Sequence, residues 1–344
     1  MSPPAAPPAS ASELKPPGAE WVERFRQDFT ALYERAGAVP ADGAPVALAV
    51  SGGADSMAML LLAAAAFPGR VAAATVDHGL RAEAVDEAAM VAAVCTGLGV
   101  PHATLAPAAP IAGSSIQMRA REARYAALAT WAEGIGAAAL LTAHHADDQA
   151  ETLLMRLNRA SGVAGLSGIR PRRFAGDCLV LRPLLGWRRA ALHEVVAAAG
   201  VPYIDDPTNA DPRHDRTRVR DFLAQQQLLD PAALAQSAAH LGEAEAALDA
   251  LAETLAAERW APGKGLLRAA DLPREMQRRL VRRAVAETRA AHGIAAPAFS
   301  DAANIEPLLD ALAAERPATQ AGVLVTPEHD RRWRFAPAPP RRAH

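Results

Sequence analysis

Cysteine, lysine and aromatic residues are scarce in this chain of 344 residues. Its two cysteines, Cys95 and Cys178, are far apart and belong to no CxxC pair, so neither a disulfide framework nor a zinc or iron–sulfur site is supported. No apolar run reaches the roughly 18 uninterrupted residues of a membrane helix, because Pro, Gly or a charged residue breaks each one. Residues 1–18 lack the basic-then-apolar order of a secretory signal. We therefore expect a cytoplasmic protein without membrane contacts.

Charge of one sign does not dominate either, since the formal net charge is −2. Only Lys15 and Lys264 of the 36 basic residues are lysine, and the others are arginine. The arginines are concentrated between 156 and 220, whereas 243–258 holds no basic residue. This uneven distribution permits a phosphate-binding face on a nearly neutral protein.

Short apolar runs alternate with helical patterns in the N-terminal part of the chain. The expected strands are 46–50, 71–76, 100–105, 138–142 and 200–205, and helical spacing connects them at 57–66, 82–98, 116–132 and 190–199. This alternation is typical of an α/β fold with a doubly wound, mostly parallel sheet. Ligands of such sheets bind at the carboxyl ends of the strands.

From about Pro231 the pattern becomes mainly helical. Stretches rich in Ala and Leu at 232–260 and apolar spacing at 276–291 predict two long helices, and a small hairpin is expected between 322 and 335. The length of the chain favours two domains. We therefore expect a disordered tail at 1–22, an α/β catalytic domain at 23–225, a smaller mainly helical domain at 231–335 and a disordered tail at 336–344.

A glycine-rich turn follows the first expected strand and carries the sequence Ser51-Gly52-Gly53-Ala54-Asp55-Ser56. A strand that ends in such a turn and opens a helix directs backbone N–H groups and the positive end of the helix dipole at one point, which suits a phosphate chain. The two serines offer hydroxyl groups, and Asp55 can hold a magnesium ion or fix the loop. No lysine follows, so the turn is not a Walker loop. A turn that merely caps a helix would share the Ser-Gly-Gly part.

A second polar cluster begins where the strand at 138–142 stops. In the following helix Asp148 and Glu151 share one face, and His144 lies one turn upstream. Two carboxylates here can hold an ammonium group or a magnesium ion. Acidic residues in a first helical turn are also favoured by the helix dipole alone, but the adjacent His144 and His145 exceed what helix capping requires.

The hexapeptide at 51–56 matches the SGGxDS signature of the PP-loop ATP pyrophosphatases, and the chain resembles that family. Members split ATP between the α and β phosphates and leave AMP on a substrate oxygen. Further segments resemble the tRNA(Ile)-lysidine synthetase family within it, strongly over roughly 45–220 and weakly beyond. They are VDHGLR at 76–81, AHHADDQAET at 143–152, GLSGI at 165–169, RPLL at 182–185 and DDPTN at 205–209.

This resemblance implies the attachment of L-lysine to C2 of the wobble cytidine in tRNA(Ile) with the anticodon CAU, at the expense of ATP. It implies that residues 51–56 hold the phosphates of ATP, that Asp55 shares Mg²⁺, and that Val76, Asp77 and His78 flank the adenine. The equivalents of His144, Asp148 and Glu151 line the lysine site. For His78 a structural role is an open alternative.

Two arginine-bearing segments extend the resemblance. Residues 117–125 are similar to the ExxARxxRY segment of the family, which makes Arg121 a candidate for a catalytic phosphate or anticodon contact, with Arg124 behind it. Arg216 and Arg220 belong to a stretch similar to the family's basic RNxIR segment near the target base, but Thr217 stands where asparagine is usual. A further row on the helix at 276–291 and just before it is a candidate tRNA contact, and GLSGI and RPLL are interpreted as structural. The row comprises Arg274, Arg278, Arg279, Arg282 and Arg283.

Other functions remain open at this point. A tRNA thiolase of the same superfamily requires a catalytic cysteine pair, for which the spacing here is unsuitable. An amide-forming synthetase that uses ammonia usually carries a glutaminase or dimerisation segment that is absent here. A non-catalytic ATP-binding sensor has no use for the acidic pair at 148 and 151. The oligomeric state cannot be inferred from the sequence.

Overall fold

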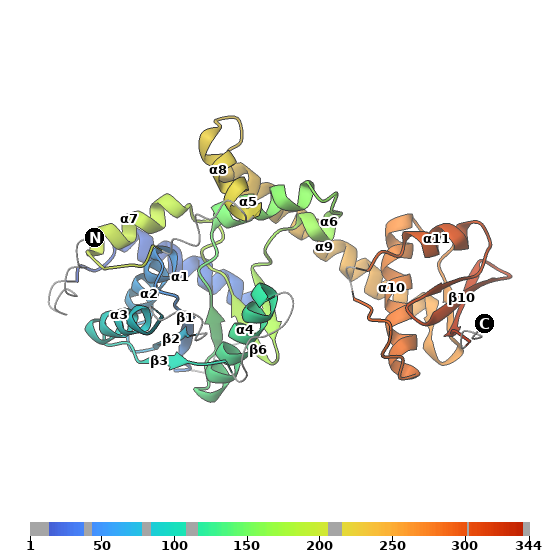
Figure 1. Ribbon diagram of the computed structural model, residues 1–344, viewed down its shortest axis with the longest axis horizontal. Coiled ribbons are helices and arrows are strands. Elements are labelled where there is room, and N and C mark those ends of the chain that lie inside the picture. The colour runs from blue at the N-terminus through green and yellow to red at the C-terminus, as the bar shows by residue number, and fades with distance from the viewer. Residues whose placement is uncertain are drawn as a thin grey trace. The chain divides into compact units, whose positions relative to one another are not determined.

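A computed structural model describes residues 14–37, 43–77, 84–107, 116–205, 215–300 and 303–339. The chain divides into two compact units, Met1–Gly242 and Glu243–His344 (Figure 1). The division falls inside the long helix α9 (Pro231–Arg259), whereas the sequence pattern places the domain boundary just before that helix. Within the described residues, no helix has both the length and the apolar character of a membrane span.

The first unit is built on a six-stranded sheet with the strand order β3-β2-β1-β4-β6-β5. The five strands from β3 to β6 in this order pair in parallel, and only the edge strand β5 runs antiparallel, so the predicted doubly wound, mostly parallel sheet is confirmed. The strands are β1 (Val46–Ala49), β2 (Val71–Val76), β3 (His102–Leu105), β4 (Ala139–Leu141), β5 (Arg172–Ala175) and β6 (Cys178–Leu181).

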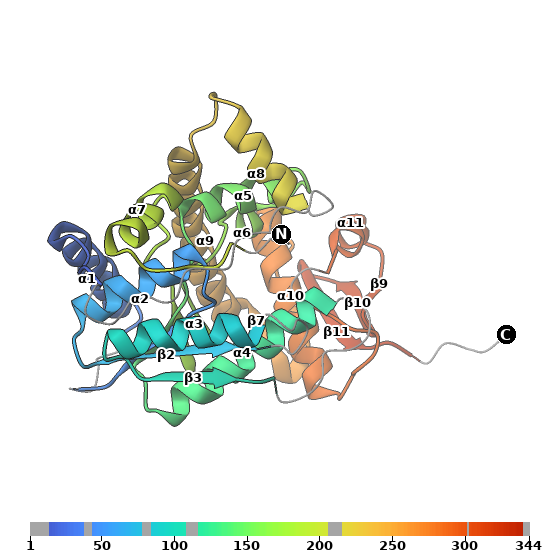
Figure 2. The same cartoon turned by 60° about the vertical axis from the view of Figure 1, so that its left-hand side comes forward.

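Eight helices among the described residues accompany this sheet. They are α1 (Ala19–Glu34), α2 (Ala54–Ala66), α3 (Ala84–Gly97), α4 (Ile116–Gly134), α5 (Ala146–Leu157), α6 (Val163–Leu166), α7 (Arg189–Ala199) and α8 (Asp215–Gln225). Helix α2 packs against both α1 and α7 (Figure 2). Since α2 is Ala-, Leu- and Met-rich on every side, it is buried along almost its whole length, as an all-round apolar helix must be.

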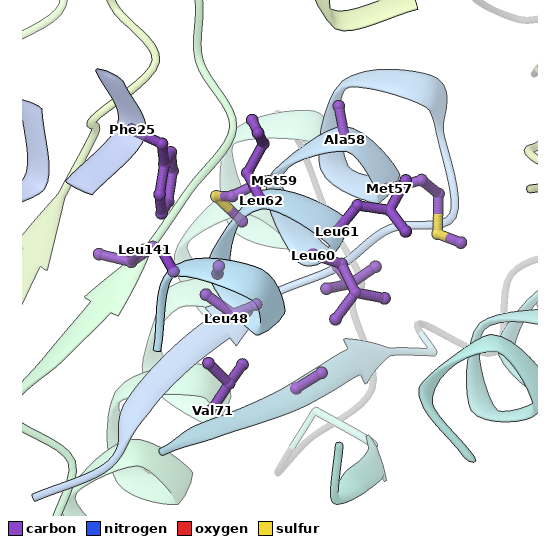
Figure 3. Close-up of a cluster of buried hydrophobic side chains, with 14 of the residues drawn as sticks. Phe25, Leu48, Met57, Ala58, Met59, Leu60, Leu61, Leu62, Val71 and Leu141 are labelled. Atoms are coloured by element: carbon purple, nitrogen blue, oxygen red, sulfur yellow. The ribbon is translucent and has the colours of Figure 1, made fainter. Parts of the chain in front are cut away.

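The two faces of the sheet follow from the alternation of side chains along each strand. Leu48 and Leu141, which are neighbours in register, lie in the core cluster formed with α1, α2 and α7 (Figure 3). Ala47 and Leu140 lie on the other face, against Tyr125 and other residues of α4. Both faces are thus covered, and the carboxyl edge of the strands is left for the polar residues.

Three predictions made from the sequence need correction. The tail predicted for 1–22 ends too late, because α1 begins at Ala19 and buries aromatic side chains at helical spacing. The tail predicted for 336–344 begins too early, because strand β11 runs to Pro337. The strand predicted at 200–205 is reduced to one parallel bridge between Ile204 and Gly53, since the chain there touches the glycine turn and not the sheet.

The second unit contains a five-stranded antiparallel sheet of order β7-β8-β11-β10-β9 beside its helices. Its elements after α9 are β7 (Trp260–Ala261), the 3-10 turn η2 (Pro262–Lys264), β8 (Leu266–Arg268), α10 (Arg274–Ala291), α11 (Glu306–Ala313), β9 (Ala318–Gln320), β10 (Val323–Glu328) and β11 (Arg332–Pro337). The predicted hairpin is β10–β11. The sequence gives no signal for β7, β8 and β9 because each has only two or three residues.

Helix α1 is expected to contribute to the stability of the first unit. Phe25 is fully buried, so Phe25→Ala should lower the free energy of unfolding by about 3–5 kcal/mol. Thr30→Ala on the exposed face of the same helix should change it by less than about 0.5 kcal/mol. Urea unfolding of the full chain measures both, and equal small effects would show that α1 is not part of the core.

Candidate active site

A cavity of about 610 Å³ opens at the carboxyl ends of β1, β2 and β4. The structure brings together in its lining most of the site residues predicted from the sequence, namely Ser51, Gly53, Asp55, Ser56, Val76, Asp77, Arg121, Arg124, His144, Asp148 and Arg216. Gly52 and Ala54 belong to the same turn, and Glu151 and Arg220 lie beside Arg216. His78 lies outside the described residues.

The glycine turn is closed by hydrogen bonds of its two serines. Ser56 Oγ accepts from the backbone N–H of Ser51 at 3.1 Å and donates to the carbonyl of Gly53 at 2.9 Å. Gly53 is the N-cap of α2, and no side chain caps this helix. The Ser56 N–H donates to the Gly53 carbonyl at 3.0 Å, whereas the N–H groups of Ala54 and Asp55 have no acceptor among the described residues and are available to a ligand, as at other anion sites on helix N-termini.

Gly52 has a conformation that only glycine adopts without strain here. Its φ is +87°, and a Cβ at this position would clash with Ile204 Cδ1. The backbone N–H of Ile204 donates to the Gly52 carbonyl at 2.9 Å. Ile204 thus holds the turn from outside, a role that the sequence does not reveal because it depends on a contact between distant segments.

His145 joins the glycine turn to helix α5. Its side chain is 3% exposed, and its Nε2 lies 3.4 Å from Asp55 Oδ2. Its Nδ1 accepts from the backbone N–H of Asp148 while Asp148 Oδ2 accepts from the backbone N–H of His145, so the pair forms a capping box. His145 is therefore the N-cap of α5 and at the same time contacts Asp55, so it does more than cap the helix.

His145 and Asp55 each favour the charged form of the other. Burial alone would lower the pKa of His145, but the hydrogen bond to Asp55 and the charges of Asp148, Asp55 and Asp147 raise it. Burial alone would raise the pKa of Asp55, but the hydrogen bond and charge of His145 lower it. Asp55 is therefore ionised at neutral pH, as a magnesium ligand must be.

The residues present fit a magnesium ion that is shared with phosphates. Asp55 Oδ1 is buried without a hydrogen-bond partner among the described residues. The same part of the chain holds no group of three or more His, Cys, Asp or Glu that would form a complete protein-only metal site. One carboxylate plus substrate phosphates is how proteins commonly hold Mg²⁺, and Asp55 offers that carboxylate.

The acidic pair on α5 is engaged by arginines of α8. Asp148 Oδ1 accepts from Arg216 at 2.7 Å, and Glu151 Oε2 accepts from the Nε of the same arginine at 2.6 Å. Glu151 Oε1 accepts from Arg220 at 2.7 Å. The Glu151 side chain is 3% exposed, so its charge depends on these two guanidinium groups. Thr217, between them, is buried.

His144 occupies a different electrostatic environment from its neighbour. Burial lowers its pKa well below the usual value, and the positive charges of Arg182, Arg121, Arg216 and Arg124 lower it further. Its Nδ1 lies 3.1 Å from Thr142 Oγ1. His144 is therefore neutral at neutral pH and adds no positive charge to the cavity.

The arginine row on α10 does not form an open basic face. Arg278 and Arg279 bind carboxylates of α9, α10 and α11, and the hydrogen bond from Arg278 lowers the pKa of Glu306 to about 2. Arg274 and Arg283 are also ion-paired, and Arg282 donates to the carbonyl of Ala303. Most of these partners are acidic residues that are distant in the sequence. The prediction of a tRNA contact from the arginine row alone did not include them.

The comparisons with known proteins agree with this geometry. Residues 22–227 match the PP-loop domain family. The chain is 45% identical over 336 residues to the tRNA(Ile)-lysidine synthase of Novosphingobium aromaticivorans, covering 94% of this chain and 95% of that protein. It is 39% identical over 347 residues to the tRNA(Ile)-lysidine synthase of a Bradyrhizobium species, covering 90% and 94%.

Among solved structures, the chain is similar to the U34-tRNA thiolase NcsA from Methanococcus maripaludis with its [4Fe-4S] cluster. The TM-score is 0.51 at 15% identity, and the match covers 65% of this chain and 79% of the thiolase. This likeness concerns the fold alone.

A substitution of the glycine turn tests its conformation. Gly52→Ala should lower the free energy of unfolding by roughly 1–2 kcal/mol of backbone strain plus a smaller cost, because the new methyl group must also turn aside the end of the Ile204 side chain, and it should weaken ATP binding. Gly69→Ala is the matched control, since Gly69 has φ +72° and nothing within 4 Å of its Cβ position. Urea unfolding and calorimetric ATP titration measure both effects; equal losses in the two variants would contradict the clamp by Ile204.

The PP-loop family matches residues 22–227, where the glycine turn after β1 and the acidic pair on α5 lie, and the relatives align along nearly the whole chain. This protein therefore belongs to the tRNA(Ile)-lysidine synthase family and carries a PP-loop domain.

Proposed function

We propose that this chain joins L-lysine to C2 of the wobble cytidine of tRNA(Ile) with the anticodon CAU, with ATP as the activating substrate and AMP and pyrophosphate as products. The observation that carries the proposal is one cavity lined both by the SGGxDS turn and by Asp148 of α5, with Glu151 joined to it through Arg216. The names of the relatives supply the RNA substrate. We further propose that the protein works in the cytoplasm, where a tRNA substrate is found.

The first step of the proposed reaction activates the C2 oxygen of the cytosine. The C2 oxygen of cytosine is a poor leaving group, so it must attack the α-phosphorus of ATP and expel pyrophosphate before an amine can replace it. The turn at 51–56 and the N-terminus of α2 would hold the phosphates in line for this attack. Asp55 would hold Mg²⁺, which neutralises the charge that develops on the departing pyrophosphate.

The second step requires an uncharged amine. Lysine arrives as an ammonium ion, and Asp148 and Glu151 are the acidic groups of α5 that would attract it. The amine must lose a proton before it attacks C2 and displaces AMP. His144 is neutral and therefore does not repel the arriving cation.

Arg216 competes with lysine for these carboxylates. It binds Asp148 and Glu151 at once, whereas Glu151 is the one carboxylate that Arg220 binds among the described residues. We propose that Arg216 leaves at least one carboxylate when lysine binds and then contacts the RNA near the target base. Arg220 stays with Glu151 and keeps that buried charge compensated.

The alternatives are less well supported. Cys95 lies in α3 and Cys178 in β6, both buried and unpaired, and burial raises the pKa of Cys95 to about 12. Such thiols suit neither a thiolase nor cluster binding. A sensor would not form AMP, and the relatives described above do not favour an amide-forming synthetase.

We also propose that residues 231–335 add contacts to the tRNA. Arg268 and Arg316 in this part are exposed and have no carboxylate partner among the described residues. They are better placed than the paired arginines of α10 for contacts with phosphates.

Asp55→Asn tests the phosphate site. It keeps the size of the side chain and a hydrogen-bonding oxygen but removes the charge, so lysidine formation should fall by about 10²- to 10³-fold, with AMP and pyrophosphate falling in parallel. The control Asp177→Asn changes an exposed turn residue and should have no effect. Labelled lysine incorporation into tRNA(Ile) and into tRNA(Met) measures activity and specificity. Turnover at the wild-type level in Asp55→Asn would remove this residue from the mechanism.

Arg216→Gln tests the competition on α5. If Arg216 must leave before lysine binds, its removal should lower the KM for lysine several-fold, while tRNA binding weakens. Arg218→Gln on the same helix is the matched control, since that side chain is 71% exposed and its one carboxylate partner in the described part of the chain is Asp215, at 3.9 Å. Initial rates at varied lysine concentration decide the point, and a raised KM in Arg216→Gln would mean that Arg216 helps to bind lysine instead.

A further inference from the structure

Four arginines gather around one buried tyrosine beside the cavity. The guanidinium carbons of Arg173, Arg121 and Arg124 lie 3.9, 5.3 and 5.8 Å from the ring centroid of Tyr125, within the range of cation–π contacts. Arg182 is 3% exposed and donates to the Tyr125 hydroxyl at 3.5 Å. The tyrosine itself is 5% exposed.

Within the described residues these charges are not neutralised. None of the four arginines forms an ion pair with a carboxylate there, in contrast to the arginines of α8 and α10. The Nε atoms of Arg173 and Arg182 are buried without a hydrogen-bond partner in the same part of the chain. Like charges at this spacing repel one another, so the cluster is arranged for an anion.

The titration of the cluster agrees with this geometry. Burial lowers the pKa of Arg124 and of Arg182, and neighbouring arginines lower both further. Burial alone would raise the pKa of Tyr125, but the charge and hydrogen bond of Arg182 lower it. A bound anion would relieve both effects, because it adds the negative charge that the cluster lacks.

The cluster is separate from the turn that receives the ATP phosphates. Arg182 directly follows β6, and the turn follows β1, with β4 between them in the sheet, a separation on the order of 10 Å. Arg173 lies on the edge strand β5. Arg121 is exposed and lines the cavity together with Arg124, so the cluster extends from the solvent inward. This position suits a polymer that continues out of the cavity.

We propose that Arg121, Arg124, Arg173 and Arg182, arranged around Tyr125, form a subsite for a phosphodiester group of the RNA substrate next to the nucleotide that reacts. Arg121 and Arg124 contact the phosphate from the cavity wall. Arg173 and Arg182 fix the tyrosine and add positive charge behind it. The identity of the RNA in this subsite rests on the proposed function. That the subsite binds a phosphodiester anion follows from the arginine cluster itself.

The strand β5 supplies a matched pair of variants. Arg172 and Arg173 are consecutive, so their side chains point to opposite faces, and Arg172 is exposed with no carboxylate partner among the described residues. The affinity of the full chain for a tRNA(Ile) transcript is measured by filter binding at several KCl concentrations. Arg173→Gln should make the dependence of log Kd on log salt shallower, by at most about one unit because it removes one positive charge behind the phosphate, and Arg172→Gln should leave it unchanged.

Further variants separate a charge effect from a folding effect. Arg173→Lys should restore the salt dependence, because it restores the charge. Tyr125→Phe should weaken RNA binding by less than Arg173→Gln does, since it removes only the hydroxyl that Arg182 binds. Thermal melting of each variant checks that the fold is kept.

Titration with ATP alone distinguishes the source of the phosphate. Unchanged ATP affinity in Arg173→Gln supports the RNA subsite. If Arg173→Gln lowers the ATP affinity and leaves the salt dependence of RNA binding unchanged, the RNA subsite is overturned and the cluster binds an ATP phosphate. If Arg172→Gln and Arg173→Gln change the salt dependence of RNA binding equally, the subsite is overturned in favour of a general effect of surface charge. Because binding is measured without turnover, a salt effect in a chain that forms no lysidine would refute the proposed function and leave the subsite standing.

Discussion

A cavity that must receive phosphates and a cationic amine has to keep opposite charges apart until the substrates arrive. Here the glycine turn and the arginines around Tyr125 provide positive potential, whereas Asp148 and Glu151 on α5 provide negative charge. Left alone, buried groups of opposite sign would pair and close the site. The protein instead divides the cations: Arg216 and Arg220 compensate the acids, and the cluster around Tyr125 has no acid partner among the described residues.

The parallel sheet makes this separation possible. Its carboxyl edge places the turn after β1, the histidines after β4 and Arg182 after β6 at successive positions along one edge. His145 then couples two of these positions, because it caps α5 and holds Asp55 through the same ring. His145 therefore connects the turn that bears Asp55 with the first turn of α5 that bears Asp148.

The sequence predicted the sheet, its ligand-binding edge and most of the cavity lining, because strand alternation and the SGGxDS turn are local signals. It did not predict what depends on distant partners. The contact of Ile204 with Gly52, the contact of His145 with Asp55 and the ion pairs of the α10 arginines each join segments whose proximity only the fold defines. The sequence shows Tyr125 as the last residue of the segment at 117–125. Its contacts with Arg173 and Arg182 could not be predicted, because they depend on where the fold places β5 and β6.

The proposed reaction depends on the transfer of AMP to the C2 oxygen of the target cytidine, and an isotope experiment tests this transfer directly. A tRNA(Ile) transcript whose wobble cytidine carries a heavy oxygen isotope at C2 is incubated with the protein, ATP, Mg²⁺ and lysine, and the AMP is analysed by mass spectrometry. If the C2 oxygen is adenylated, the heavy oxygen appears in the phosphate of AMP in proportion to the lysidine formed. Lysidine formation with unlabelled AMP would contradict this transfer.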